Sequence, residues 1–136
     1  MSKTVGFIIA VCLLMGFEGC AQNGKDNSGT KQTEYRRISA DEAKKMLDEN
    51  PKAILVDVRT EGEYKDGHIK GAILLPLADI QAKAAEVLPD KNALILVYCR
   101  SGQRATSAAN QLIAMGYTNV YNMGGIINWN YSTEKG

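Results

Sequence analysis

Two continuous apolar runs dominate the hydrophobic pattern of the chain. One spans residues 53–58 and carries a single acid, Asp57, near its end, and the other spans residues 93–98 and ends directly before Cys99. Unbroken runs of this length are typical of parallel strands that are buried on both faces. The pattern therefore predicts two central strands of a parallel sheet.

Segments with helical signals alternate with these runs. Ser39 and Glu42 have the spacing of a capping box, which predicts that a helix begins after Ser39. Gly116 suits the position just beyond a helix end, so residues 104–115 are predicted to be a helix. The other expected elements are short strands at residues 35–38 and 119–122, a turn and strand at 67–76, helices around 61–64 and 78–88, and a turn at 124–125 that leads into a short helix with Trp129.

This alternation predicts an α/β fold. We expect residues 34–136 to form one domain with a central, mostly parallel five-stranded sheet flanked by helices on both faces. Ligands of such sheets bind outside the carboxyl ends of the strands. The residues that directly follow the two buried runs are therefore the candidate site residues.

The first 33 residues differ from this domain. An apolar segment at residues 5–17 has the length of a signal-peptide core and is too short to span a bilayer comfortably, so residues 1–19 are predicted to be an export signal. The Gly19-Cys20 pair resembles the cleavage site of bacterial lipoproteins, where the cysteine is acylated, although Phe17 and Glu18 depart from that pattern. Residues 20–33 are expected to be a flexible tether.

These features predict a location for the protein. The chain is expected to be exported from the bacterial cytoplasm and held in the cell envelope, facing the periplasm, by a lipid on Cys20. A lipid anchor would be its one link to a membrane. The alternative is a soluble periplasmic protein cleaved near Ala21.

Composition narrows the possible partners. The chain has 16 basic and 15 acidic residues, a net charge of +1, and no basic stripe. No nucleic-acid partner is expected, because such binding needs several phosphates neutralised together. No set of His, Cys, Asp and Glu has the spacing of metal ligands, so neither a metal nor another cofactor is expected. The charged helix faces favour a monomer.

Cys99 is the one thiol that the mature domain is expected to keep, because Cys12 leaves with the signal and Cys20 is acylated. A lone cysteine has no internal disulfide partner, so it is either a small core residue or a reactive group. It lies between a strand end and a helix start, where the helix macrodipole, Arg100 and Arg104 all favour a thiolate with a lowered pKa.

The residues after Cys99 are suited to holding an anion. Ser101 is small, and Gly102 is able to adopt the positive φ that turns successive N–H groups inward. The residues therefore predict nucleophilic cysteine chemistry on an anionic substrate.

Three blocks of the sequence match a known family pattern. They lie at residues 56–72, at 99–104 (Cys-Arg-Ser-Gly-Gln-Arg) and at 116–129. In this order they resemble the single-domain rhodaneses, a family of sulfurtransferases, over residues 35–131. The resemblance implies that Cys99 attacks the outer sulfur of thiosulfate or a similar small anion, releases sulfite and holds a persulfide until a small-molecule or protein thiol, or cyanide, removes the sulfur.

The resemblance also implies roles for the neighbouring residues. The loop N–H groups of Arg100, Ser101, Gly102, Gln103 and Arg104 would cradle the persulfide, while one of the two arginines orients the donor. Asp57 and Arg59 belong to the first block and are expected to support the site. Asp57 is interpreted as structural, whereas Arg59 either reaches the pocket or pairs with Asp57 or Glu63. The single histidine, His68, is expected to serve the fold.

A cysteine loop of this kind also serves other functions. Related phosphatases and arsenate reductases have five residues between cysteine and arginine, whereas four separate Cys99 from Arg104, which favours sulfur over phosphate. A noncatalytic binding module or a thiol-redox protein on the same fold is the remaining alternative.

Overall fold

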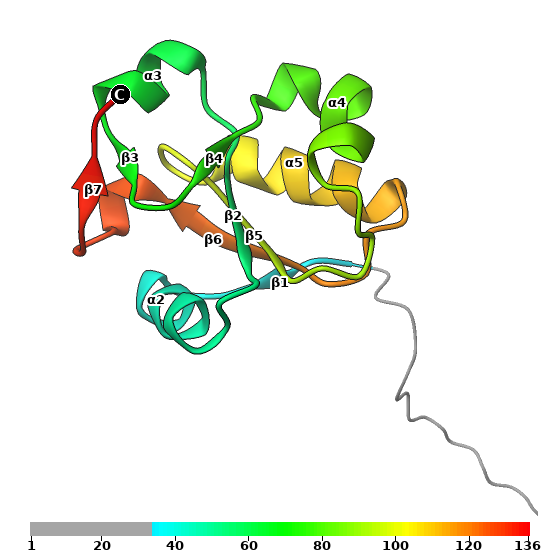
Figure 1. The fold of residues 1–136 in the computed structure, drawn as a ribbon, viewed down its shortest axis with the longest axis horizontal. Coiled ribbons are helices and arrows are strands. Elements are labelled where there is room, and N and C mark those ends of the chain that lie inside the picture. The colour runs from blue at the N-terminus through cyan, green and yellow to red at the C-terminus, as the bar shows by residue number, and fades with distance from the viewer. Residues whose placement is uncertain (1–33) are drawn as a thin grey trace, which may run out of the picture. The chain divides into compact units, whose positions relative to one another are not determined.

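The computed structural model describes residues 34–136, which form an α/β domain (Figure 1). Its main sheet has five strands in the order β1-β6-β5-β2-β4, and all four pairings are parallel. The strands are β1 (Arg36–Arg37), β2 (Ile54–Asp57), β4 (Ile73–Leu74), β5 (Ile95–Cys99) and β6 (Val120–Gly125). The predicted fold class is confirmed, and the two apolar runs are the adjacent strands β2 and β5.

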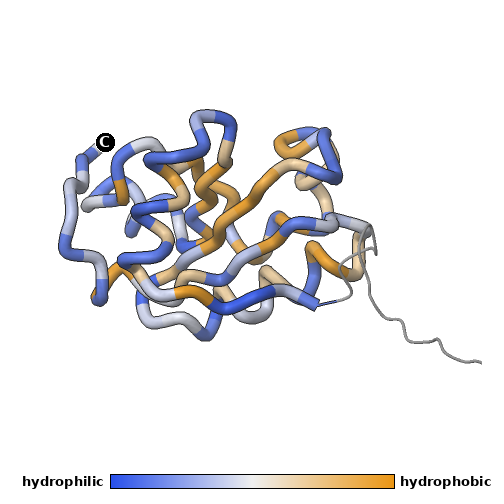
Figure 2. Tube along the Cα trace, turned by 90° about the horizontal axis from the view of Figure 1, so that it is seen from below, coloured by the Kyte–Doolittle hydropathy of each residue, from blue (hydrophilic) through white to orange (hydrophobic). Residues whose placement is uncertain are grey.

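Helices cover both faces of this sheet (Figure 1). Alternate residues of β2 and β5 enter two separate hydrophobic clusters, one with α4 and α5 and the other with α2. Figure 2 shows the apolar residues concentrated along the central strands. The helices are α2 (Ala40–Glu49), α3 (Glu61–Asp66), α4 (Ile80–Val87), α5 (Gln103–Ala114) and the short 3-10 turns η3 (Leu77–Asp79) and η4 (Ile126–Asn128).

Local signals account for several of the helix ends. The predicted capping box of α2 is confirmed, because the Glu42 N–H donates to Ser39 Oγ at 3.1 Å and the Ser39 N–H donates to Glu42 Oε1 at 2.8 Å. Gly116 follows α5 with φ of 100°, a left-handed conformation that glycine adopts without a Cβ penalty.

The structure differs from the sequence prediction near the C-terminus. The predicted turn at Gly124 and Gly125 is instead the end of β6, and the terminal helix is the three-residue η4, which ends before Trp129. The strand continues because Gly125 pairs with Cys99 beyond an irregularity in the β5–β6 register. A second, antiparallel sheet of β3 (His68–Ile69) and β7 (Thr133–Glu134) was not predicted, because these strands are far apart in sequence.

The predictions for residues 1–33, including the export signal, Cys20 and the tether, lie outside the described residues and stay predictions. Within the described part of the chain, no helix is long and apolar enough to cross a membrane.

Candidate active site

The loop between β5 and α5 surrounds the sulfur of Cys99. Cys99 is the last residue of β5, and only 1% of it is exposed. The Gly102 N–H donates to Cys99 Sγ at 2.9 Å, which requires the chain to turn back at Gly102, where φ is 115°. Thr106 holds this turn, because its N–H and its hydroxyl each donate to the Gly102 carbonyl at 3.0 Å.

The start of α5 also differs from the starts of α2 and α3. Thr60 and Glu63 form a capping box on α3, as Ser39 and Glu42 do on α2, whereas no side chain caps α5. The first N–H groups of a helix have no partner within the helix. At α5 they are left available next to the Cys99 sulfur, and they carry the positive end of the helix macrodipole.

The β6 backbone lies unusually close to this loop. A Cβ atom on Gly125 would lie 2.1 Å from the Arg100 carbonyl oxygen and 2.6 Å from Ser101 Cα. The end of β6 is fixed by buried Asn122, whose side chain accepts from the Gly124 N–H at 2.8 Å and donates to Thr106 Oγ1 at 3.1 Å. Asn122 therefore joins β6 to the first turn of α5, and the loop is held from both sides.

A buried ion pair supports the strand ends beside the loop. Arg59 donates to Asp57 through its backbone N–H at 2.9 Å and through its guanidinium at 2.7 to 3.0 Å. The Tyr98 hydroxyl donates to the same carboxylate at 2.7 Å. Burial lowers the pKa of the Arg59 guanidinium, but hydrogen bonding and Coulombic attraction to Asp57 outweigh it, and the pKa lies above its ordinary value. Arg59 also donates to the Gly67 carbonyl at 2.7 Å, so it connects β2 to the end of α3.

Arg104 is engaged by a carboxylate. Its guanidinium donates to Glu63 Oε1 at 2.7 Å and to Oε2 at 3.0 Å, which is a bidentate ion pair between α5 and α3. Chiefly through this hydrogen bond, Arg104 lowers the pKa of the Glu63 carboxyl to about 2. One of the two arginines that the sequence offered as donor-binding groups is therefore already paired.

This pair predicts a pH dependence of stability. Because the pKa of Glu63 is lower in the folded than in the unfolded chain, its contribution is present above about pH 4.5 and is lost as the pH falls toward 2. We expect Glu63→Gln to be less stable than the wild type at pH 7 by about 1 kcal/mol, a value reduced for solvent screening. The difference should shrink at pH 3, as measured by urea unfolding.

The matched control for this experiment is Glu61→Gln on the same helix. The Glu61 side chain is 71% exposed and pairs only with Lys65, so its loss should change stability little at either pH. An unchanged difference between wild type and Glu63→Gln across this pH range would contradict the role given to the pair.

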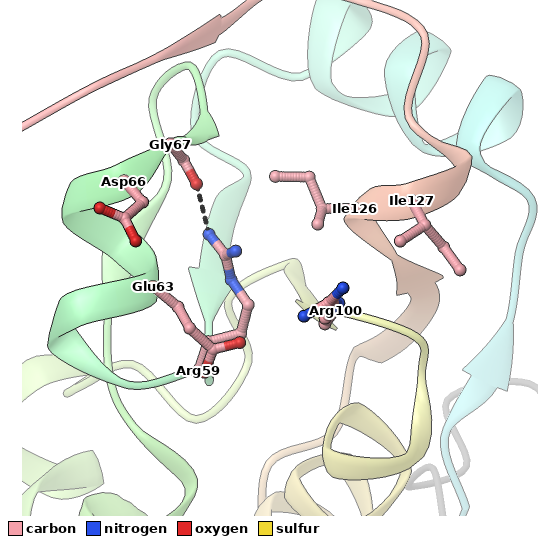
Figure 3. A pocket seen from close by; sticks show the side chains of 7 residues that line it. All are labelled: Arg59, Glu63, Asp66, Gly67, Arg100, Ile126 and Ile127. Carbon is pink, nitrogen blue, oxygen red and sulfur yellow. Dashed lines mark hydrogen bonds between the residues drawn. The ribbon is translucent and has the colours of Figure 1, made fainter.

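A pocket of about 320 Å³ lies beside the loop (Figure 3). Arg59, Glu63, Asp66 and Gly67 line one side, and the other side is formed by Arg100, Ile126 and Ile127, as seen in Figure 3. Within residues 34–136, the exposed Arg100 side chain forms no hydrogen bond or ion pair. Arg100 directly follows Cys99 in the chain, so this guanidinium, unpaired within the described domain, lines a pocket that borders the cysteine loop.

The structure brings most of the predicted residues together. Residues 99–104 run from the end of β5 through the loop into the start of α5, and Asp57 and Arg59 pair at the end of the neighbouring strand β2, whereas Cys20 lies outside the described residues. Ser101 and Gln103 have exposed side chains and border the site through their backbone. Glu63 was predicted only as a possible partner of Arg59, and its pair with Arg104 was not predicted. Asn122 and Gly125 were not predicted as site residues, because the sequence carries no local signal for their contacts.

The parallel sheet and the cysteine loop at the carboxyl end of β5 define a rhodanese-type domain. A family model for the rhodanese-like domain matches residues 39–132, and the chain belongs to this family. The resemblance inferred from the three sequence blocks is confirmed at this level.

Similar proteins agree with this assignment. The chain is 41% identical to the thiosulfate sulfurtransferase PspE of Escherichia coli (strain K12) over 71 residues, which is 52% of this chain and 68% of that protein. It is 36% identical to a sulfurtransferase of Allochromatium vinosum over 93 residues, 68% of this chain and 85% of that protein. A solved structure described as a rhodanese with anions from E. coli is 37% identical, with a TM-score of 0.59, and the match covers 62% of this chain and 99% of that one.

The family also includes larger proteins. A tRNA uridine(34) hydroxylase of Photorhabdus laumondii is 36% identical over 105 residues, but the match covers only 29% of that protein. The comparisons therefore place the chain in the rhodanese-like sulfurtransferase family without specifying its donor.

Proposed function

We propose that the protein is a thiosulfate-type sulfurtransferase that carries a sulfane sulfur on Cys99. The observation that carries this proposal is the 2.9 Å hydrogen bond from the Gly102 N–H to Cys99 Sγ, at the start of a helix that no side chain caps. Donors aimed at a sulfur stabilise its negative charge, either as a thiolate or as a persulfide.

The reaction then proceeds by two displacements. The Cys99 thiolate attacks the outer sulfur of the donor, a sulfur–sulfur bond forms, the sulfur–sulfur bond of thiosulfate breaks, and sulfite leaves with that electron pair. Because the nucleophile in this step is the thiolate, the displacement itself needs no general base. Arg100, which has no side-chain partner within residues 34–136 and follows Cys99 in the chain, is the group that would bind the negatively charged end of the donor.

His68 is placed away from this chemistry by its contacts. Its ring stacks on Tyr64 with centroids 3.7 Å apart, and Nδ1 lies 2.9 Å from the Tyr64 carbonyl oxygen. Nε2 lies 3.4 Å from Glu134 on β7. Both ring nitrogens therefore have partners, Nδ1 on α3 and Nε2 on β7, which supports a structural role.

The proposed function is tested by treating the full chain with thiosulfate and measuring its intact mass. We expect the mass of one sulfur atom to be added to the wild type and removed again by cyanide. In steady-state assays, Arg100→Gln should raise the KM for thiosulfate about tenfold, because a charge-assisted hydrogen bond to the donor is lost.

Arg36→Gln is the control, since Arg36 is an exposed arginine on edge strand β1, which β6 separates from β5, and it does not line the pocket. It should leave the KM unchanged. Failure of the wild type to gain sulfur would rule out thiosulfate as the donor, and an equal effect of both variants would remove the role given to Arg100.

A further inference from the structure

A polar side chain lies on the apolar face of the sheet that α5 covers (Figure 1). Asn122 is 2% exposed, lies opposite Val97 of β5 and alternates with Val120 along β6. Both valines belong to the hydrophobic cluster against α4 and α5. A buried amide is costly unless its polar atoms are hydrogen-bonded, whereas an apolar side chain would fill the position without that cost. The contacts of Asn122 therefore have to account for an amide at this position.

The groups at both ends of these contacts fix the direction of each hydrogen bond. The Gly124 N–H lies 2.8 Å from the Asn122 oxygen and can only donate, so the amide nitrogen faces Thr106 Oγ1, at 3.1 Å. The Thr106 hydroxyl therefore accepts from Asn122, and its own proton goes to the Gly102 carbonyl at 3.0 Å, which can only accept. Three hydrogen bonds thus run in one direction, from the β6 backbone to the start of α5.

Asn122 selects one orientation of a hydroxyl that otherwise has two. A threonine in a helix divides between two χ1 rotamers, because its hydroxyl is able to bond the carbonyl four residues earlier. Here that carbonyl belongs to Gly102, the residue whose N–H donates to Cys99 Sγ at 2.9 Å. The carbonyl also accepts from the Thr106 N–H at 3.0 Å, so the hydroxyl adds a second donor, which Asn122 holds in place from β6.

The orientation of the Gly102 carbonyl determines where the next N–H points. In a trans peptide the C=O and the N–H point in opposite directions, so donors that hold the Gly102 carbonyl toward Thr106 turn the Gln103 N–H away from the helix. That N–H is the first of α5 and has no partner within the helix. Gly102 has φ of 115° and, without a Cβ, meets few steric barriers to rotation. The two donors of Thr106 therefore restrain the peptide that follows Gly102.

We infer that Asn122 is a positioning residue for the reaction at Cys99. Through the Thr106 hydroxyl it holds the Gly102 carbonyl, and this restraint keeps the Gly102 N–H on the sulfur, where it stabilises the thiolate and the persulfide. The inference deepens the proposed function, on which it rests for the role of Cys99. It predicts that the reactivity of the sulfur depends on a hydroxyl and an amide that act only through the backbone of the loop.

The first test compares the rate at which iodoacetamide alkylates Cys99 in the full chain of the wild type and of Thr106→Val, which removes the hydroxyl and keeps the branched shape. Alkylation is measured by peptide mass, because the full chain also contains Cys12 and Cys20. We expect the rate to fall about fivefold at pH 7, the size of one typical hydrogen bond. At pH 10 the rates should be nearly equal, because a thiol is ionised there without help from the loop.

Thr106→Ser keeps the hydroxyl, so it should restore the wild-type rate at pH 7. If Thr106→Val were slowed equally at pH 7 and pH 10, or if Thr106→Ser were as slow as Thr106→Val, the loss would reflect a general disturbance of the loop. Either result would overturn the inference, and so would an unchanged rate in Thr106→Val.

The second test asks whether Asn122 acts through Thr106. Asn122→Leu replaces the amide with an apolar side chain of similar size, and we expect it to slow alkylation at pH 7 about threefold. Added to Thr106→Val, it should slow the reaction no further than Thr106→Val does alone. Effects that multiply in the double variant would contradict the relay. Asn122→Ser, which is too short to reach Thr106, takes the place of Asn122→Leu if that chain does not fold.

Thr118→Val is the matched control, because Thr118 is also a partly buried threonine whose hydroxyl donates to a backbone carbonyl, that of Lys91 at 3.3 Å. It lies just before β6, at the end of that strand away from Cys99, so its alkylation rate should match the wild type at both pH values. Equal slowing by Thr118→Val would overturn the inference. Alkylation needs no sulfur donor, so failure of the wild type to take sulfur from thiosulfate would count against the proposed function alone.

Discussion

Replacing Cys99 with serine is expected to reduce sulfur transfer by at least about a thousandfold, because the attacking atom is removed. No other cysteine is present in residues 34–136, so no second thiol of the domain is available to replace it. Transfer is measured as the rate of sulfite release from thiosulfate, together with the mass of sulfur added to the protein.

The serine variant should remain folded. Its hydroxyl is able to accept the hydrogen bond that the Gly102 N–H now donates to Cys99 Sγ at 2.9 Å. Cys99 is buried in the cluster against α4 and α5, so we expect a stability loss of only about 1 kcal/mol by urea unfolding. Retention of sulfite release by a folded Cys99→Ser chain would remove Cys99 as the nucleophile.

The second large effect is expected from Gly125→Ala. The new Cβ would lie 2.1 Å from the Arg100 carbonyl oxygen, so the cysteine loop or the end of β6 has to move. The nearest atoms, which belong to Arg100 and Ser101, are backbone atoms. No flexible side chain is therefore available to move aside and relieve the overlap. We expect a stability loss of about 3 kcal/mol and a loss of activity of at least about a hundredfold, because displacement of the loop turns its N–H groups away from the sulfur.

Gly62→Ala is the control for this substitution. Gly62 lies within α3, and a Cβ atom there would meet nothing within 4 Å. Alanine favours helices over glycine by about 1 kcal/mol, so this variant should be slightly more stable and fully active. To separate misfolding from a local effect, the alkylation rate of Cys99 is measured in the folded fraction of Gly125→Ala. A rate equal to that of the wild type would show that the loop is undisturbed and that the argument from Gly125 is wrong.

The two substitutions probe different requirements of the same loop. Cys99 supplies the reacting atom, whereas Gly125 permits the neighbouring strand to approach closely enough to hold Arg100 and Ser101 in place. The second requirement arises where β5 and β6 meet beyond the register change that follows Val97. A member of this family that keeps the cysteine but has a larger residue at the position of Gly125 is therefore expected to be inactive.

Local sequence patterns predicted most of the elements. The runs at residues 53–58 and 93–98 are continuous because both faces of a central strand are buried, and the structure confirms them as β2 and β5. The capping box at Ser39 and the glycine after α5 were also readable, since each depends on neighbouring residues only. The β3–β7 pairing and the end of β6 were not, because hydrogen bonds between segments distant along the chain determine them.

The features of the candidate site also fall into those that local sequence predicted and those that depend on contacts between distant segments. Cys99 and the turn at Gly102 followed from their position between a buried strand and a helix. The sequence did not predict which of the two arginines is free. Arg104 is paired with Glu63, which lies 41 residues earlier in the chain, whereas the Arg100 side chain has no partner in the described domain. Spacing along the chain predicted both to lie near the sulfur, and only the ion pair between α3 and the first turn of α5 separates their roles.

The sequence by itself determined the fold class, the reactive cysteine and the loop that surrounds it, because strand burial, helix starts and glycine turns depend on short-range patterns. The tertiary structure decided which charges are free, since the pairing of Arg59 with Asp57 and Gly67 and of Arg104 with Glu63 depends on the packing of α3 and α5 at the carboxyl edge of the sheet. It also decided that Gly125 must be a glycine. Local sequence does not indicate a backbone contact of this kind, because the two segments that form it come together only in the folded chain.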